Sequence, residues 1–189
     1  GRAAAEDALQ YAALGTIADI VPLLGENRAI VALGLAKINE APQPGLRALM
    51  NVAGLREGNI VASDIAYKLA PRINAGGRLS LSGRSVHMLL ADSLEEAMPV
   101  AGELNADNYR RQQIEAQMIA DAHRMLADFD ASRAHVIVLA HPGWNEGVVG
   151  VVAARIARAY SRPTILLAHH ADDVCVGSGR SVPNVHLFE

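Results

Sequence analysis

Four short segments hold the residues best suited to chemistry, because each mixes glycine with polar or charged side chains where a loop is expected. They are Gly15–Asp19, Pro71–Arg78, His141–Gly147 and Gly177–Ser181. Arginine is the dominant cation, since only two of the 17 basic residues are lysines. Its planar guanidinium suits paired phosphate oxygens better than the point charge of lysine does. The composition therefore indicates a phosphorylated ligand, although a genome rich in arginine codons would leave the same pattern.

The first segment places one carboxylate, Asp19, in an apolar stretch that is expected to be a loop. A buried carboxylate must be hydrogen-bonded, ion-paired or bound to a metal ion. The alternative is a cap or turn residue without chemistry. The sequence contains no HxH, HExxH or CxxC pattern that would supply further ligands. Asp19 alone therefore does not define a metal site.

The second segment is predicted to contain a turn, Asn74–Arg78, between two helices. Its paired glycines would let the backbone approach a ligand closely, and arginines flank them. A helix-ending turn with solvated arginines is the alternative.

The third segment, His141–Gly147, follows an expected strand and leads into an expected helix. The free N–H groups of a helix start bind anions, and ligands gather at the carboxyl ends of strands in open α/β sheets. Trp144 could stack on a base, or could instead cover the sheet edge. Arg155, two turns further along the helix, could reach the same side.

The fourth segment is predicted to be a turn after the last strand, in which alternating glycine and serine expose consecutive backbone N–H groups as a nest for phosphate. Arg180 would supply the positive charge. The candidate phosphate contacts here are Gly177, Ser178, Gly179, Arg180 and Ser181.

Helices are expected to position the first two segments. Hydrophobic periodicity and proline positions predict helices over 3–14, 26–39, 45–52, 63–70 and 83–91. Gly15 and Thr16 are expected to break the first of them. Ser63 is expected to cap the fourth, which should end before Pro71.

A long helix is expected from the capping box Ser93–Glu96 onward. Its middle, Asn105–Gln113, is almost wholly polar, which is typical of a connector between two bodies. Pro99 should either kink this helix or divide it.

A small sheet is expected to position the last two segments. Buried strands are predicted over 135–140, 163–167 and 174–176, with a helix over 147–160. The first two strands should be parallel, with a right-handed crossover. The fold class is therefore α/β: a mostly helical part over 1–92, a connecting helix over 93–131, and a partial α/β domain with a mixed or parallel sheet over 132–189.

The composition excludes several classes of protein. No apolar run approaches the roughly 18 residues of a membrane span. The single Cys175 excludes an internal disulfide and indicates a reducing compartment, so we expect a cytoplasmic protein. The start lacks both a methionine and a signal-peptide pattern, which suggests that a segment precedes it.

Taken in order, these segments resemble the RecJ nucleases of the DHH phosphoesterase superfamily. The resemblance rests on Gly15–Leu23 with Glu26–Arg28, Pro71–Arg78, Asn108–Arg111 with Glu115, His141–Gly150, Ala154–Arg155 and Gly177–Ser181. It departs from the family pattern at Gly76, where alanine is common, and at Val176, where a lysine is frequent and would add attraction for phosphate.

The resemblance implies a 5′-to-3′ exonuclease that releases mononucleotides from single-stranded DNA with Mn²⁺ or Mg²⁺, in recombination and repair. It also implies the tail of a DHH catalytic domain, the connecting helix and part of the DHH-associated domain. Asp19 alone would correspond to a metal ligand, and the Asp-x-Asp and Asp-His-His segments are expected upstream of Gly1. The chain by itself is therefore expected to be inactive.

The resemblance also assigns roles to residues. Asp19 and His141 would be catalytic, with Asp19 on the metal, and Asn74 and Trp144 would contact the nucleotide. Phosphates would be bound by Arg78, Arg155 and Gly177–Ser181. A helicase or a single-strand-binding protein would be a further partner. Two alternatives are a phosphoesterase for short oligonucleotides or cyclic dinucleotides, and a non-catalytic binding module.

Overall fold

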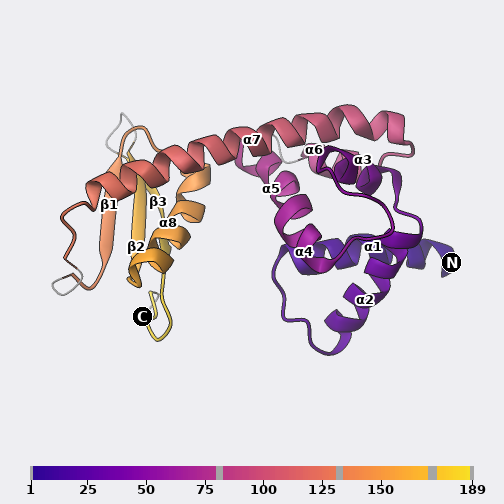
Figure 1. The fold of residues 1–189 in the computed structure, drawn as a ribbon, viewed down its shortest axis with the longest axis horizontal. Coiled ribbons are helices and arrows are strands. Elements are labelled where there is room, and N and C mark those ends of the chain that lie inside the picture. Colours follow the sequence, from indigo (N-terminus) through magenta and orange to yellow (C-terminus); the bar gives the residue numbers. More distant parts are fainter. Residues whose placement is uncertain (1, 80–82, 131–133, 170–173, 188–189) are drawn as a thin grey trace. The chain divides into compact units, whose positions relative to one another are not determined.

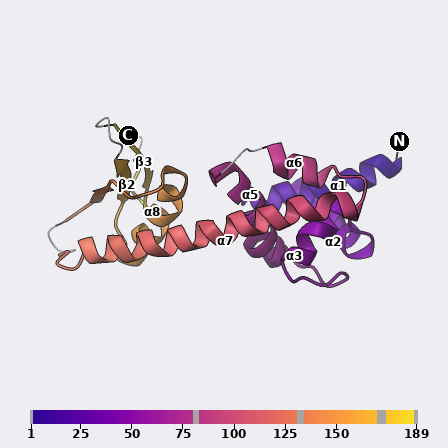
Figure 2. The same cartoon turned by 90° about the horizontal axis from the view of Figure 1, so that it is seen from above.

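The computed structural model describes residues 2–79, 83–130, 134–169 and 174–187 of the chain. These residues form two compact units, Gly1–Tyr109 and Arg110–Glu189, and each has its own hydrophobic core. Figure 1 and Figure 2 show that the first unit is helical and that the second contains the sheet. Within the described residues, no helix has the length and apolar character that crossing a membrane requires.

The first unit is built from short helices around one core. Its elements are α1 (Arg2–Ala18), α2 (Gly25–Glu40), α3 (Pro44–Val52), α4 (Ala62–Asp64), the π-helical η1 (Ile65–Leu69), α5 (Ala70–Leu79) and α6 (Gly83–Leu89). Helices α1 and α2 pack closely, because a Cβ on Gly34 would lie 2.4 Å from the Cβ of Ala13. The predicted helices over 26–39, 45–52 and 83–91 are confirmed to within a few residues.

The predicted break at Gly15 and Thr16 is wrong, since α1 continues to Ala18. Thr16 fits the helix because its hydroxyl donates to the carbonyl of Ala12 at 2.7 Å. A glycine inside a helix costs only about 1 kcal/mol. Burial of Leu14 and Ile17 in the core on either side of the expected break outweighs that cost.

The predicted helix end before Pro71 is also wrong. Helical structure runs without interruption from Ala62 to Leu79, so Ser63 lies inside it and is not the cap. The π-helical turn η1 explains why Pro71 is tolerated: the N–H of Ala70 donates to Ile65, one residue further back than in an α-helix. The predicted turn Asn74–Arg78 is part of α5.

The long helix is confirmed as a single element, α7 (Leu94–Met125), with Pro99 inside it. Ser93 caps its start, because the Ser93 hydroxyl accepts from the N–H of Glu96 at 3.1 Å. The boundary between the two units, after Tyr109, falls within the polar stretch 105–113. The expected connector is therefore continuous through the division.

The second unit is a three-stranded sheet with helices. Its elements are the last part of α7, β1 (Ile137–His141), α8 (Glu146–Tyr160), β2 (Thr164–His169) and β3 (Cys175–Arg180). The strand order is β1-β2-β3, with β1 parallel to β2 and β3 antiparallel to it. The sheet is therefore mixed, and the predicted parallel pair is confirmed. Strand β3 is longer than predicted, and Cys175 at its start is exposed.

Candidate nucleic-acid interface

Asp19 lies directly after α1 and is exposed. Its N–H donates to the carbonyl of Gly15 at 3.0 Å, which continues the hydrogen bonding of the helix. The described residues contain no group of three His, Cys, Asp or Glu side chains that could hold a metal ion. Within the part of the chain that the structure describes, Asp19 therefore offers one carboxylate and no complete metal site.

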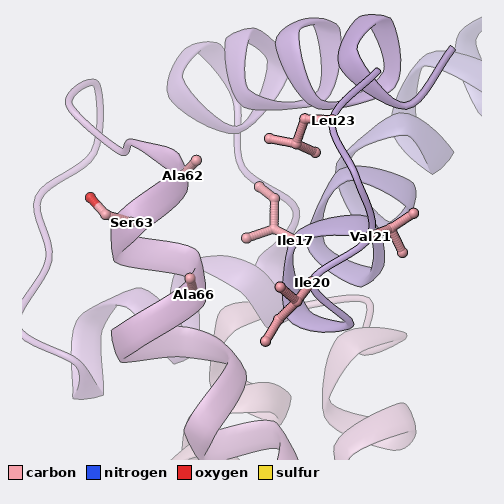
Figure 3. A pocket seen from close by; sticks show the side chains of 7 residues that line it. All are labelled: Ile17, Ile20, Val21, Leu23, Ala62, Ser63 and Ala66. Atoms are coloured by element: carbon pink, nitrogen blue, oxygen red, sulfur yellow. The ribbon is translucent and has the colours of Figure 1, made fainter. Parts of the chain in front are cut away.

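An apolar pocket of about 220 Å³ lies beside the end of α1 (Figure 3). Its lining residues are Ile17, Ile20, Val21 and Leu23 from the end of α1 and the following segment, and Ala62, Ser63 and Ala66 from the facing helix. The Ser63 hydroxyl is the one polar side-chain group among these residues. The pocket therefore offers little to a phosphorylated ligand.

The segment Pro71–Arg78 does not bring backbone to a ligand, as the predicted turn would have done. Gly76 is buried, and a Cβ there would lie 2.9 Å from Leu104 and 3.1 Å from the Ser85 hydroxyl. Its small size therefore serves helix packing. Asn74 is exposed on α5. The side chain of Arg78 lies outside the described residues, so its phosphate contact stays a prediction.

The third segment lies where the sequence predicts it, between the last residue of β1, His141, and the start of α8. The Nδ1 atom of His141 accepts from the N–H of Gly143 at 3.0 Å, which fixes the imidazole at the end of the strand. Trp144 is only 5 % exposed and packs in the core of the second unit. Its ring lies 5.7 Å from that of His141, between centroids. Burial favours the structural alternative for Trp144, support of the sheet and of His141.

Helix α8 begins with a side-chain cap. Asn145 accepts from the N–H of Gly147 at 3.0 Å, so one of the free N–H groups of the helix start is already satisfied.

Asp121 of α7 is buried. Burial alone would favour its neutral form, but hydrogen bonds from Arg124 and Gln117 and the positive charge of Arg124 outweigh burial, so the pKa of Asp121 is lowered.

The predicted turn Gly177–Ser181 is wrong, because Gly177–Arg180 forms the last four of the six residues of strand β3. Extended backbone alternates its N–H groups and cannot form the predicted nest. Gly177 is required by the sheet: a Cβ there would lie 2.4 Å from the carbonyl oxygen of Leu166 on β2. The strand nevertheless brings two predicted side chains together, since Arg180 donates to the Ser178 hydroxyl at 2.8 Å.

Ser178 and Arg180 lie on the side of β3 that faces α8. A Cβ on Gly150 of α8 would lie 3.0 Å from Nη2 of Arg180 and 3.2 Å from the Ser178 hydroxyl. A glycine at this position therefore leaves room for both polar groups beside the first half of the helix. Arg180 is exposed and carries its charge at the surface.

Arg155, further along α8, is held by α7. Its Nε atom lies 2.6 Å from Oε1 of Glu115, and Arg111 pairs with the other oxygen of the same carboxylate. The side chain of Glu115 is only 4 % exposed and that of Arg155 is 62 % exposed. A cavity of about 370 Å³ lies here, lined by Arg111, Gln112, Glu115, Ala116, Ile119 and Arg155. Glu115 has no predicted role in binding, although its spacing of four residues from Arg111 predicts a pair on one helix face.

Among the exposed arginines of the second unit, Arg180 lies beside the Ser178 hydroxyl and Arg155 lies beside Glu115. Guanidinium and hydroxyl groups donate hydrogen bonds to anionic oxygens. The chemistry that these groups support is binding of phosphate groups. Asp19 and Asn74 belong to the other unit.

No family model matches the chain. The single-stranded-DNA-specific exonuclease RecJ of Escherichia coli (strain K12) is 38 % identical over 183 residues, which are 95 % of this chain and 32 % of that protein. RecJ of Thermus thermophilus is 43 % identical over 163 residues, 85 % of this chain and 23 % of that protein.

The comparison with solved structures also finds RecJ proteins. The crystal structure of Thermus thermophilus RecJ in complex with Mn²⁺ superimposes with a TM-score of 0.78 at 39 % identity, over 94 % of this chain and 26 % of that one. The Mg²⁺ complex gives a TM-score of 0.79 at 38 % identity, over 95 % of this chain and 28 % of that one. The chain therefore belongs to the RecJ family, as a segment that spans less than a third of the curated relatives it matches.

Proposed function

We propose that this chain acts as part of a RecJ-type exonuclease and that its second unit binds the phosphate backbone of single-stranded DNA. The whole protein would hydrolyse such DNA from 5′ to 3′ and release mononucleotides, in DNA recombination and repair. The observation that supports this proposal most directly is the pair of exposed arginines, Arg155 and Arg180, in a chain that is similar to single-stranded-DNA-specific exonucleases.

The two arginines are suited to phosphate in different ways. The Nη1 atom of Arg180 donates to the Ser178 hydroxyl and to the carbonyl of Gly179. The guanidinium is therefore held at the surface next to the Ser178 hydroxyl, which is a second donor. Arg155 is anchored by its Nε atom, so its two Nη groups can donate to an anion. His141 would approach the terminal nucleotide from the end of β1, with Trp144 supporting its ring.

Metal ions would act in the whole protein. A two-metal centre activates the attacking water and stabilises the charge of the attacked phosphate, and it needs several carboxylate or imidazole ligands. Asp19 would supply one of them, and the described residues do not supply the rest. We therefore expect the other ligands in further segments of a longer polypeptide. Mn²⁺ and Mg²⁺ are the candidate ions, since Thermus RecJ binds both.

The finer assignments belong to the same proposal. Asn74 and Arg78 of α5 would contact the DNA, and the backbone from Gly177 to Ser181 would lie beside the phosphate that Arg180 binds. A helicase or a single-strand-binding protein would supply or protect the substrate. The protein would act in the cytoplasm, which suits the single free thiol of Cys175.

Alanine substitutions of the two arginines test the DNA-binding part of this proposal. Arg155→Ala and Arg180→Ala should each weaken binding of a 5′-phosphorylated single-stranded oligonucleotide, and each should reduce the salt slope by about 1. Fluorescence anisotropy at several salt concentrations measures both quantities.

Arg158→Ala is the matched control, because Arg158 is an exposed arginine in the last turn of α8 and makes no contact that the proposal uses. It should change affinity and slope much less than the other two substitutions. Equal losses in all three variants would reduce the role of Arg155 and Arg180 to general electrostatic attraction, and unchanged binding would overturn it.

A further inference from the structure

The carboxylate of Glu115 connects two arginines of the second unit. Arg111, one turn earlier on α7, pairs with Oε2, while Arg155, on α8, lies against Oε1 at 2.6 Å. The arrangement is asymmetric in exposure, since the side chains of Glu115 and Arg111 are 4 % and 12 % exposed and that of Arg155 is 62 % exposed. One buried pair thus holds one arginine that reaches solvent.

A carboxylate is buried at a cost in desolvation that only good pairing offsets. Glu115 has an ion-pair contact at both oxygens, of which the one from Arg111 to Oε2 is a hydrogen bond and the one at Oε1 is not. Arg111 is almost as buried as Glu115 itself. Arg111 therefore neutralises Glu115 and fixes the direction of its carboxylate. The remaining oxygen then presents a fixed acceptor to the neighbouring helix, where Arg155 lies.

Arg155 would otherwise be a mobile side chain. An exposed arginine has several rotatable bonds, and it loses that freedom when it binds a ligand in one orientation. The ion pair with Glu115 is made at the Nε atom of its guanidinium, without the alignment of a hydrogen bond. Among the residues that the structure describes, Arg155 has no other hydrogen-bond or ion-pair partner. Its Nη groups therefore stay available next to the cavity of about 370 Å³ that both residues line.

We propose that Glu115 is a positioning residue: it fixes the guanidinium of Arg155 in the orientation that binds a phosphate of single-stranded DNA. This inference rests on the proposed function, in which Arg155 contacts phosphate. Glu115 itself does not touch the DNA, and as an anion near phosphate it would by its charge alone oppose binding.

The two possible roles of Glu115, positioning Arg155 or acting only as a negative charge, predict opposite changes in DNA affinity when the charge is removed. If Glu115 were only a nearby negative charge, Glu115→Gln would make the unit more positive, strengthen DNA binding and steepen its salt dependence. If Glu115 orients Arg155, the same substitution releases Arg155 and weakens binding in spite of the added positive charge. The neutral amide keeps the size of the side chain, so the cavity is not enlarged.

The test is a double-mutant cycle with Glu115→Gln, Arg155→Ala and the combined variant in the 189-residue chain, using a 5′-phosphorylated single-stranded oligonucleotide as probe. We expect Glu115→Gln to raise Kd about fivefold to tenfold, a size typical of coupled neighbours. In the Arg155→Ala background the same substitution should cause no further loss. Glu103→Gln is the matched control, because Glu103 also lies on α7 and pairs with an arginine, Arg84, at 2.7 Å.

Folding is checked with the fluorescence of the sole tryptophan, Trp144, which is buried in the same unit. If Glu115→Gln does not fold, the Kd of Glu115→Asp tests the positioning role. This variant keeps the charge, but its side chain is one methylene too short to reach both arginines. It should weaken binding, and affinity equal to that of the parent chain would overturn the proposal.

The two proposals fail in different ways. Unchanged Kd for Arg155→Ala contradicts the phosphate contact of the proposed function. A loss for Arg155→Ala together with unchanged or tighter binding for Glu115→Gln contradicts the positioning role alone. Equal losses from Glu115→Gln in both backgrounds would also overturn positioning, because the effect would not pass through Arg155.

Discussion

At the scale of single residues, the second unit pairs its buried carboxylates with arginines. Asp121 shows this most clearly, since Arg124 donates to one of its oxygens at 2.7 Å and Gln117 donates to the same oxygen at 3.1 Å. These bonds lower the pKa of Asp121 although burial opposes ionisation. The folded state therefore favours the charged carboxylate more than the unfolded chain does.

This difference predicts how stability depends on pH. The pKa of Asp121 is lowered on folding, so its contribution is fully present above the usual aspartate pKa of about 3.9 and is lost as pH falls through the lower value in the folded state. Asp121→Asn should be less stable at neutral pH and should lose less stability between about pH 5 and pH 3. Urea unfolding followed by Trp144 fluorescence measures both. Parallel pH profiles for the two proteins would contradict this assignment.

At the scale of elements, strand β3 combines packing and binding in one short run of residues. The glycines and the polar residues alternate, so Ser178 and Arg180 face α8 while Gly177 and Gly179 occupy the other side. Gly177 has no room for a side chain beside Leu166. The glycines thus serve the sheet, and the polar residues between them are left for a ligand.

Two alanine substitutions in β3 test this division. Gly177→Ala should destabilise the chain by about 1–3 kcal/mol, because its Cβ would overlap backbone that cannot move away easily. Gly179→Ala is the control in the same strand, because its Cβ would meet the end of the flexible Leu187 side chain at 3.3 Å. Denaturant midpoints compare the two. Equal stability in both variants would show that the strand adjusts its path at Gly177.

Some of the helices and strands could be predicted from the sequence, and others could not. Buried β-branched runs predict β1, β2 and their parallel pairing, and a capping box predicts the start of α7. The last four residues of β3 could not be predicted, because glycine and serine carry no hydrophobic alternation and the pairing with β2 is a tertiary contact. The π-helical turn before Pro71 has no sequence signature either. Of the site, Arg155 and Arg180 could be predicted as residues, but the contact of Glu115 with Arg155 joins two helices that are distant in sequence.

At the scale of the whole molecule, the two units divide the expected functions. The first contains Asp19, and the second contains Arg155 and Arg180. Since the chain spans less than a third of its curated relatives, we propose hydrolysis only for a longer protein that contains it. The described residues hold too few ligands for two metal ions.

We therefore predict that the 189-residue chain binds single-stranded DNA but does not hydrolyse it with Mn²⁺, whereas a longer polypeptide that contains these residues and the remaining ligands does. Release of mononucleotides from 5′-labelled DNA measures the activity. Dinucleotides serve as a second substrate, since faster hydrolysis of dinucleotides by the longer protein would favour the oligonucleotide phosphoesterase. Mn²⁺-dependent hydrolysis by the isolated chain, with contaminating nuclease excluded, would contradict the prediction.

The exposed thiol at the start of β3 offers a practical consequence. Cys175 is the sole cysteine of the chain, so maleimide chemistry can attach a dye at one defined position without any substitution. Because strand neighbours alternate sides, the dye would project from the opposite side of β3 to Arg180, five residues away. A native sulfhydryl thus provides an optical sensor on the same strand as Arg180, and it leaves the binding groups themselves unmodified.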